Sequence, residues 1–68
     1  MKLYTLAELH EMDDASDLIE ETLRTFDSKD LYLDRLVSGQ FAISYGENIQ
    51  AVFDNYDSAE VYFDRIIN

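Results

Sequence analysis

The spacing of apolar residues changes at Gly39, and this change decides the expected fold class. Before Gly39, apolar residues recur at intervals of three and four, which is typical of amphipathic helices. After Gly39, residues 41–45 and 49–53 alternate between apolar and small or polar side chains, as strands with one covered face do. We therefore expect an α+β domain.

Three helices are expected before Gly39. Thr5 and Glu8 have the spacing of a capping box, so a short helix is expected to begin after Thr5, with or without a brief strand over residues 1–4. A second helix is expected over residues 13–26 and a third over residues 28–38, ended by Gly39. The apolar face of the second comprises Ala15, Leu18, Ile19, Thr22, Leu23 and Phe26, and that of the third Tyr32, Leu33, Leu36 and Val37.

A hairpin and a last helix are expected after Gly39. A three-residue loop, Gly46-Glu47-Asn48, pairs residue 45 with 49, 43 with 51 and 41 with 53, which brings the apolar residues to one face. A helix is expected from Asp57, and the helices must cover the hairpin, because a bare hairpin is marginal in water. The expected core comprises Leu18, Leu23, Phe41, Ile43, Phe53, Phe63 and Ile66.

The length of 68 residues predicts one domain, spanning residues 1–68. The chain contains no cysteine, so neither disulfides nor a cysteine-based zinc site can support its small core. No segment approaches the ~20 apolar residues that cross a membrane, and the first 14 residues lack the apolar centre of a secretion signal. A cytoplasmic protein is expected.

The net charge is −10, and it is unevenly distributed. Residues 1–21 contain seven acids and one base, whereas residues 22–68 contain eight acids and four bases. Such a surface repels nucleic acid and anionic membranes and attracts basic proteins. Direct binding to nucleic acid is also disfavoured because the tyrosines have acidic neighbours, as in "FDNYDSAEVYFD".

Motifs for catalysis or metal binding are missing from the sequence. His10 is the only histidine and is interpreted as a surface residue, since one histidine without cysteine cannot form the common zinc sets. The segment 54–60 lacks the glycine and the spacing of a calcium loop, and no serine lies in a nucleophile-elbow motif. We expect no catalytic residues, no metal and no cofactor, and hence no enzyme.

Two functions remain. In size and charge the chain resembles the small acidic inhibitors that phages and plasmids use against restriction, CRISPR or repair enzymes, although no motif carries the resemblance. On a helix, Asp13 and Asp17 would lie about 6 Å apart along the axis, the length scale of neighbouring phosphates. This hypothesis predicts a basic nucleic-acid-binding protein as the partner, contacted by Glu11, Asp13, Asp14, Asp17, Glu20 and Glu21.

The alternative is an interaction or regulatory module whose acidity serves only solubility. In that case an aromatic patch, or a patch around Val61, would carry the affinity, and the charges would mainly change the association rate.

Overall fold

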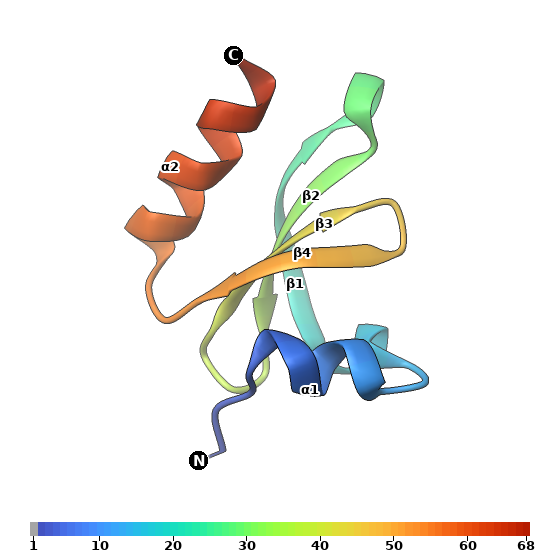
Figure 1. Cartoon of the computed structure of the whole chain (residues 1–68). Coiled ribbons are helices and arrows are strands. Elements are labelled where there is room, and N and C mark those ends of the chain that lie inside the picture. Colours follow the sequence, from blue (N-terminus) through green and yellow to red (C-terminus); the bar gives the residue numbers. More distant parts are fainter. Residues whose placement is uncertain (1) are drawn as a thin grey trace.

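The computed structural model describes residues 2–68, which form two α-helices and a four-stranded antiparallel sheet (Figure 1). The strands neighbour one another in chain order, β1-β2-β3-β4, so each pairs with the strand that precedes or follows it. The elements are α1 (Leu6–Glu11), a 3₁₀ turn η1 (Ala15–Leu18), β1 (Ile19–Phe26), a 3₁₀ turn η2 (Asp27–Lys29), β2 (Leu31–Leu36), β3 (Phe41–Tyr45), β4 (Asn48–Phe53) and α2 (Tyr56–Ile67).

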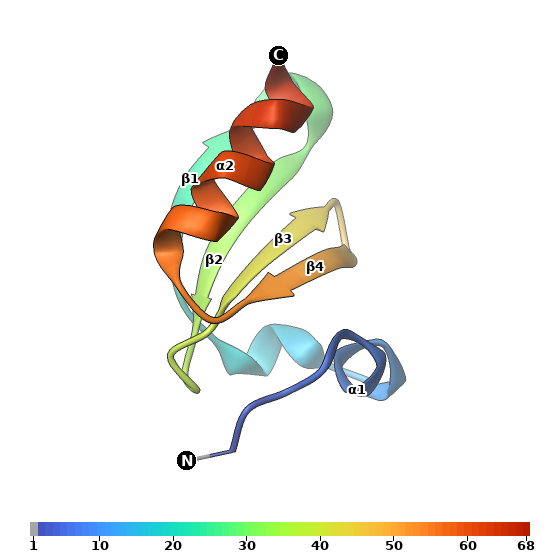
Figure 2. The same ribbon diagram turned by 60° about the vertical axis from the view of Figure 1, so that its left-hand side comes forward.

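Helix α2 covers one face of the sheet (Figures 1 and 2). Three residues point to this face and are fully buried, with 0% of their surface exposed: Leu31, Leu33 and Ile43. They pack against Ala59 and Phe63, which belong to the apolar stripe of α2. This cluster contains four of the five largest fully buried side chains of residues 2–68 and forms the main core.

Helix α1 covers part of the opposite face. Leu9 of α1 is buried against Leu36 and Ala42, which alternate in their strands with the residues that face α2. The N-terminal segment is fastened nearby, because the side-chain amide of Gln40 accepts from the Tyr4 N–H (2.8 Å) and donates to the Tyr4 carbonyl (2.9 Å). The sheet therefore has a core on each face, and the second core is the smaller.

The prediction of a second and a third helix before Gly39 is wrong. Residues 15–18 form only one 3₁₀ turn, residues 19–26 form β1, and residues 31–36 form β2. The apolar spacing in β2 resembles a helix because this strand is buried on both faces, and such strands read as nearly continuous apolar runs. The expected helical arc is also wrong at Val37, which is 49% exposed.

Electrostatics also disfavours a helix over residues 13–26. Carboxylates three and four residues apart repel each other on a helix surface. In the strand conformation, Glu20 and Glu21 instead reach Arg35 of β2, with 3.7 Å between Glu20 Oε1 and the guanidinium. Arg24 of β1 similarly reaches α2, where its guanidinium lies 3.0 Å from Asp64 Oδ1.

The hairpin of β3 and β4 is confirmed, and its loop is one residue shorter than expected. Residue 41 pairs with 53 and 43 with 51, as expected, but Tyr45 pairs with Asn48 across the two-residue turn Gly46-Glu47. The register is restored by an extra residue, Gln50, which forms a bulge in β4. Gly46 has a φ of 56°, the left-handed conformation that glycine adopts without strain at the first position of such turns.

The first and last helices are confirmed. The capping box of α1 is complete, with Thr5 Oγ1 accepting from the Glu8 N–H (3.1 Å) and Glu8 accepting from the Thr5 N–H (3.0 Å). Helix α2 begins slightly earlier than expected, and Asn55 caps it by accepting from the Ser58 N–H (2.9 Å). Residues 2–4 form no strand, and Met1 lies outside the described residues.

The expected core is confirmed at Ile43 and Phe63. The other five residues of that set lie at the edges of the two clusters and are only partly buried: Leu18, Leu23, Phe41, Phe53 and Ile66. No helix within residues 2–68 has both the length and the apolar composition needed to cross a membrane.

Candidate functional site

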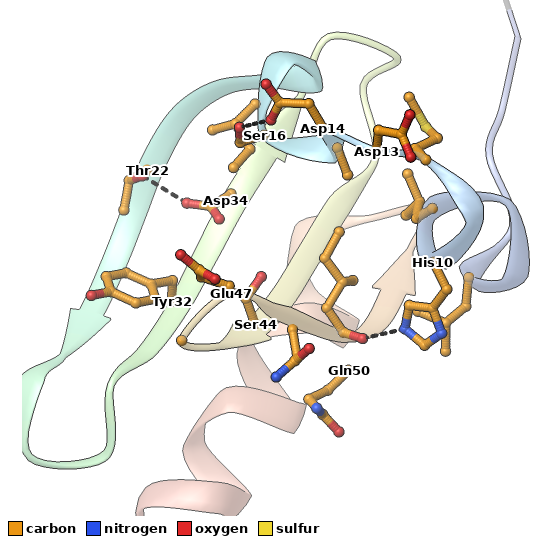
Figure 3. Close-up of a pocket in the computed structure, with 18 residues that line it drawn as sticks. His10, Asp13, Asp14, Ser16, Thr22, Tyr32, Asp34, Ser44, Glu47 and Gln50 are labelled. Atoms are coloured by element: carbon orange, nitrogen blue, oxygen red, sulfur yellow. Dashed lines mark hydrogen bonds between the residues drawn. The ribbon is translucent and has the colours of Figure 1, made fainter.

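The sheet face opposite α2 contains a groove, because α1 and η1 cover only one end of that face (Figure 3). The groove has a volume of about 1030 Å³. Its floor is formed by β2 and β3, and its rim by the loop after α1 and by the β3–β4 turn. The register of the meander therefore places polar side chains from four separate segments around one concave surface.

Asp34 and Ser44 lie on the floor of the groove and are 3% and 8% exposed. The Thr22 hydroxyl, on the neighbouring strand β1, donates to Asp34 Oδ1 at 2.7 Å. Burial raises the pKa of the Asp34 carboxyl because it disfavours the charged form, and the Thr22 hydrogen bond opposes this rise. The Ser44 hydroxyl bonds to no group of residues 2–68, and its oxygen is open to the groove, because every fully buried side-chain nitrogen or oxygen of these residues has a partner.

Tyr32 lies directly opposite Ser44 in the sheet and lines the groove. Its hydroxyl donates to Asp30 Oδ1 at 2.7 Å, at the η2 end of the strand. The pKa of the Tyr32 hydroxyl is raised, because the Asp30 carboxylate accepts a hydrogen bond from the neutral phenol and repels the phenolate.

The rim of the groove is acidic. Asp13 and Asp14 line it from the loop after α1, and Glu47 lines it from the β3–β4 turn (Figure 3). Asp14 accepts a hydrogen bond from Ser16, and the groove lining contains no lysine or arginine in the part of the chain that the structure describes. The His10 Nε2 donates to the Ile49 carbonyl at 2.6 Å and thereby fastens α1 to β4.

The ion pairs of the described chain lie away from the groove floor. They link the segment before α1 to α1, β1 to α2, and β1 to β2. Their members are Lys2 with Glu8, Arg24 with Glu60 and Asp64, and Arg35 with Glu20 and Glu21. The carboxylates around the groove are therefore left without counter-charges, although the domain contains five lysines and arginines.

The six acids of the sequence-predicted site do not share one helix face. Glu11 ends α1, Asp13 and Asp14 lie in the following loop, and Asp17 lies in η1; all four are exposed. Glu20 and Glu21 belong to β1 and are paired with Arg35. The helical distances expected between these carboxylates therefore do not apply, and only Asp13 and Asp14 reach the groove.

The sequence interpretation missed the groove floor. Asp34 lies within "LYLDRL", and an acid inside a buried strand is a signal that could have revealed the floor. Thr22, Ser44 and Glu47 are separated from it in sequence and offered no comparable signal.

The groove offers carboxylates and hydroxyls without a paired base. His10 bonds to a main-chain carbonyl and to no serine, so residues 2–68 contain no serine–histidine pair. No three carboxylate or imidazole side chains of those residues gather in a metal-binding arrangement. Its carboxylates accept hydrogen bonds and attract positive charge, and its hydroxyl and amide groups both donate and accept hydrogen bonds. Comparison of the chain with protein-family models, with curated proteins and with solved structures found no match.

Proposed function

We propose that the chain is a non-catalytic inhibitor that occupies the basic nucleic-acid-binding surface of a partner protein, as anti-restriction and anti-CRISPR proteins of similar composition do. One observation carries this proposal. Glu11, Asp13, Asp14 and Asp17 are all exposed, and none forms an ion pair with a lysine or arginine of residues 2–68. We place the inhibitor in the cytoplasm, where such partners meet nucleic acid.

The physical basis is competition between two polyanions. A basic groove that binds phosphates gains affinity because the counterions of the phosphates are released. A surface of fixed carboxylates provides the same free energy of counterion release. Carboxylates that have no internal partner contribute most, because their counterions are fully exchangeable. For this reason Glu20 and Glu21, which Arg35 partly neutralises, should contribute less than Asp13 and Asp17.

The experiment compares two double charge reversals in a competition assay. The partner is captured from the host lysate at low salt and identified, and its affinity is measured for the wild type, for Asp13→Lys/Asp17→Lys and for Asp54→Lys/Asp57→Lys. Both variants add the same charge at exposed positions, but Asp54 lies in the turn before α2 and Asp57 in the first turn of α2. We expect at least a tenfold loss of affinity in the first variant and less than threefold in the second.

Nucleic acid should displace the wild-type protein from the same partner. Equal affinities for the two variants, or simultaneous binding of the protein and nucleic acid, would contradict the proposal.

A second function, a module that binds through an apolar patch, has one observation in its favour. Val61 is 53% exposed at the centre of α2, on the side turned away from the sheet. If this helix carries the affinity, Val61→Asp should weaken partner binding more than the double reversal at Asp13 and Asp17. The same assay therefore separates the two functions.

A further inference from the structure

Asp34 is an acid in the interior with an incomplete set of partners. Its Oδ1 accepts from Thr22, and its Oδ2 accepts no hydrogen bond from residues 2–68. This second oxygen is open to the groove, because every fully buried side-chain oxygen of residues 2–68 has a partner, and a carboxylate with so little exposure is stabilised by a nearby cation or a further donor. Since Asp34 lines the groove, a ligand in the groove has access to the free oxygen.

Ser44 supplies a second, independent indication. It is also more than nine-tenths buried and lines the same groove, and its hydroxyl has no partner within the described chain. The Ser44 oxygen itself is open to solvent, because every fully buried side-chain nitrogen or oxygen of residues 2–68 has a partner, so this hydroxyl is free to bond to a ligand in the groove. Two neighbouring polar groups on one floor therefore have unused hydrogen-bonding capacity.

The sheet register fixes the relation between these two groups. Tyr32 lies directly opposite Ser44, and Asp34 is two residues further along β2 on the same face. Diagonal neighbours of this kind have Cα atoms roughly 7–8 Å apart. One small polar group between them is therefore within reach of both side chains.

The charge of that group follows from its surroundings. Asp13, Asp14 and Glu47 stand on the rim, and no lysine or arginine lines the groove within residues 2–68. The potential there is negative, so the groove repels anions and attracts cations.

The arrangement of acceptors favours an ammonium group over a guanidinium. A guanidinium binds best to both oxygens of one carboxylate in a planar fork, but one oxygen of Asp34 already accepts from Thr22. An ammonium group has three donors that point in different directions, and these suit acceptors on separate side chains. The Asp34 Oδ2 and the Ser44 Oγ are such acceptors.

We propose that the groove binds the ε-ammonium group of a lysine, with the charged head between Asp34 and Ser44. The aliphatic stem of the lysine lies along Ile49, which is paired with Ser44 and packs against Leu9 of α1. Lysine stems commonly lie on apolar surface in this way while the head remains polar. That the lysine belongs to a basic partner rests on the proposed function, whereas the binding site itself rests on the groove alone.

The experiment is an NMR titration of the whole ¹⁵N-labelled chain with three small probes. Nα-acetyl-lysine methylamide carries the ammonium on its stem, Nα-acetyl-norleucine methylamide carries the stem alone, and n-butylammonium represents a free amine. The expected result is saturable shifts at the amides of Asp34 and Ser44 with both amines, and none with the norleucine probe. A tighter complex with the lysine probe identifies a peptide lysine as the ligand, and a tighter complex with butylammonium identifies a free amine.

Three variants complete the test. Asp34→Asn keeps the shape and the Thr22 hydrogen bond but removes the charge, and it should weaken binding at least tenfold. Ser44→Ala should weaken it about threefold or more. The matched control Asp54→Asn removes an exposed charge at the β4–α2 turn and should change the affinity by less than twofold. Far-UV circular dichroism verifies that each variant is folded.

Unchanged affinity in Asp34→Asn, equal binding of the norleucine probe, or shifts confined to residues 11–17 would overturn the lysine site. These outcomes leave the competition assay at Asp13 and Asp17 unaffected, so the inhibitor proposal can succeed when the groove fails. Conversely, amine binding at Asp34 combined with equal affinities in the competition assay would retain the groove and reject the inhibitor.

Discussion

Separate replacements of Leu31 and Val37 by alanine distinguish strand β2 from a helix over residues 28–38. In the helix, Val37 belongs to the apolar arc and Leu31 lies outside it. In the structure the two residues exchange roles: Leu31 is 0% exposed beneath Ala59 and Phe63, whereas Val37 follows the end of β2 and is 49% exposed. The strand therefore predicts the larger loss of stability for Leu31→Ala, whereas the helix predicts the larger loss for Val37→Ala.

The expected magnitudes differ enough to be measured. Truncation of a fully buried leucine removes its transfer free energy and leaves a cavity, which together cost about 2–5 kcal/mol. For a 68-residue chain, a typical total stability is roughly 3–10 kcal/mol, so Leu31→Ala removes a large part of it. Val37 lies at the surface, so Val37→Ala should change the free energy of unfolding by less than about 0.5 kcal/mol.

The assay is equilibrium unfolding in urea, followed by far-UV circular dichroism. If Leu31→Ala is unfolded without urea, Leu31→Val provides a graded measurement, because it removes one methylene and should cost about 1 kcal/mol. A loss above about 1 kcal/mol in Val37→Ala, combined with a loss below about 0.5 kcal/mol at Leu31, would refute the strand assignment.

Two further predictions concern pH and helix capping. Because burial raises the pKa of Asp34 in the folded state, the native protein holds this proton more firmly than the unfolded chain does. The resulting stabilisation is present below about pH 4, the ordinary range of aspartate, and is lost as the pH rises through the folded value. The difference in unfolding free energy between Asp34→Asn and the wild type should therefore increase, in favour of the variant, from pH 3 to pH 7; a constant difference would contradict this coupling. At the start of α2, Asn55→Ala should cost about 1 kcal/mol in urea unfolding, whereas Asn55→Asp should stay within a few tenths because aspartate also accepts from the Ser58 N–H.

The effect of Asp34 on stability and its proposed role in binding have opposite signs. Removing its charge should stabilise the protein at neutral pH and weaken the binding of an ammonium group. A residue that lowers stability where a ligand would compensate it is typical of binding sites. Measuring both properties on the same Asp34→Asn variant therefore connects the fold to the groove.

The sequence by itself determined the elements whose signals are local. The capping box at Thr5 and Glu8 involves residues one helical turn apart, and the stripe of α2 repeats within 12 residues. The hairpin follows from the alternation on both sides of a glycine turn. Residue 41 pairs with 53 and residue 43 with 51, as expected, because a bulge in β4 compensates for the shorter loop. In each case the interactions that decide the conformation lie within the segment itself.

Only the tertiary structure decided the conformation of residues 15–36. The apolar residues of β2 fit a helix as well as a strand that is covered on both faces, and the choice depends on pairing with β3, on the cover that α2 supplies and on the Arg35 pairs. The groove depends on the same long-range pairing. Asp34, Ser44 and Thr22 come from three strands, and they meet because the pairing of β2 with β1 and with β3 places them on the face that α2 does not cover.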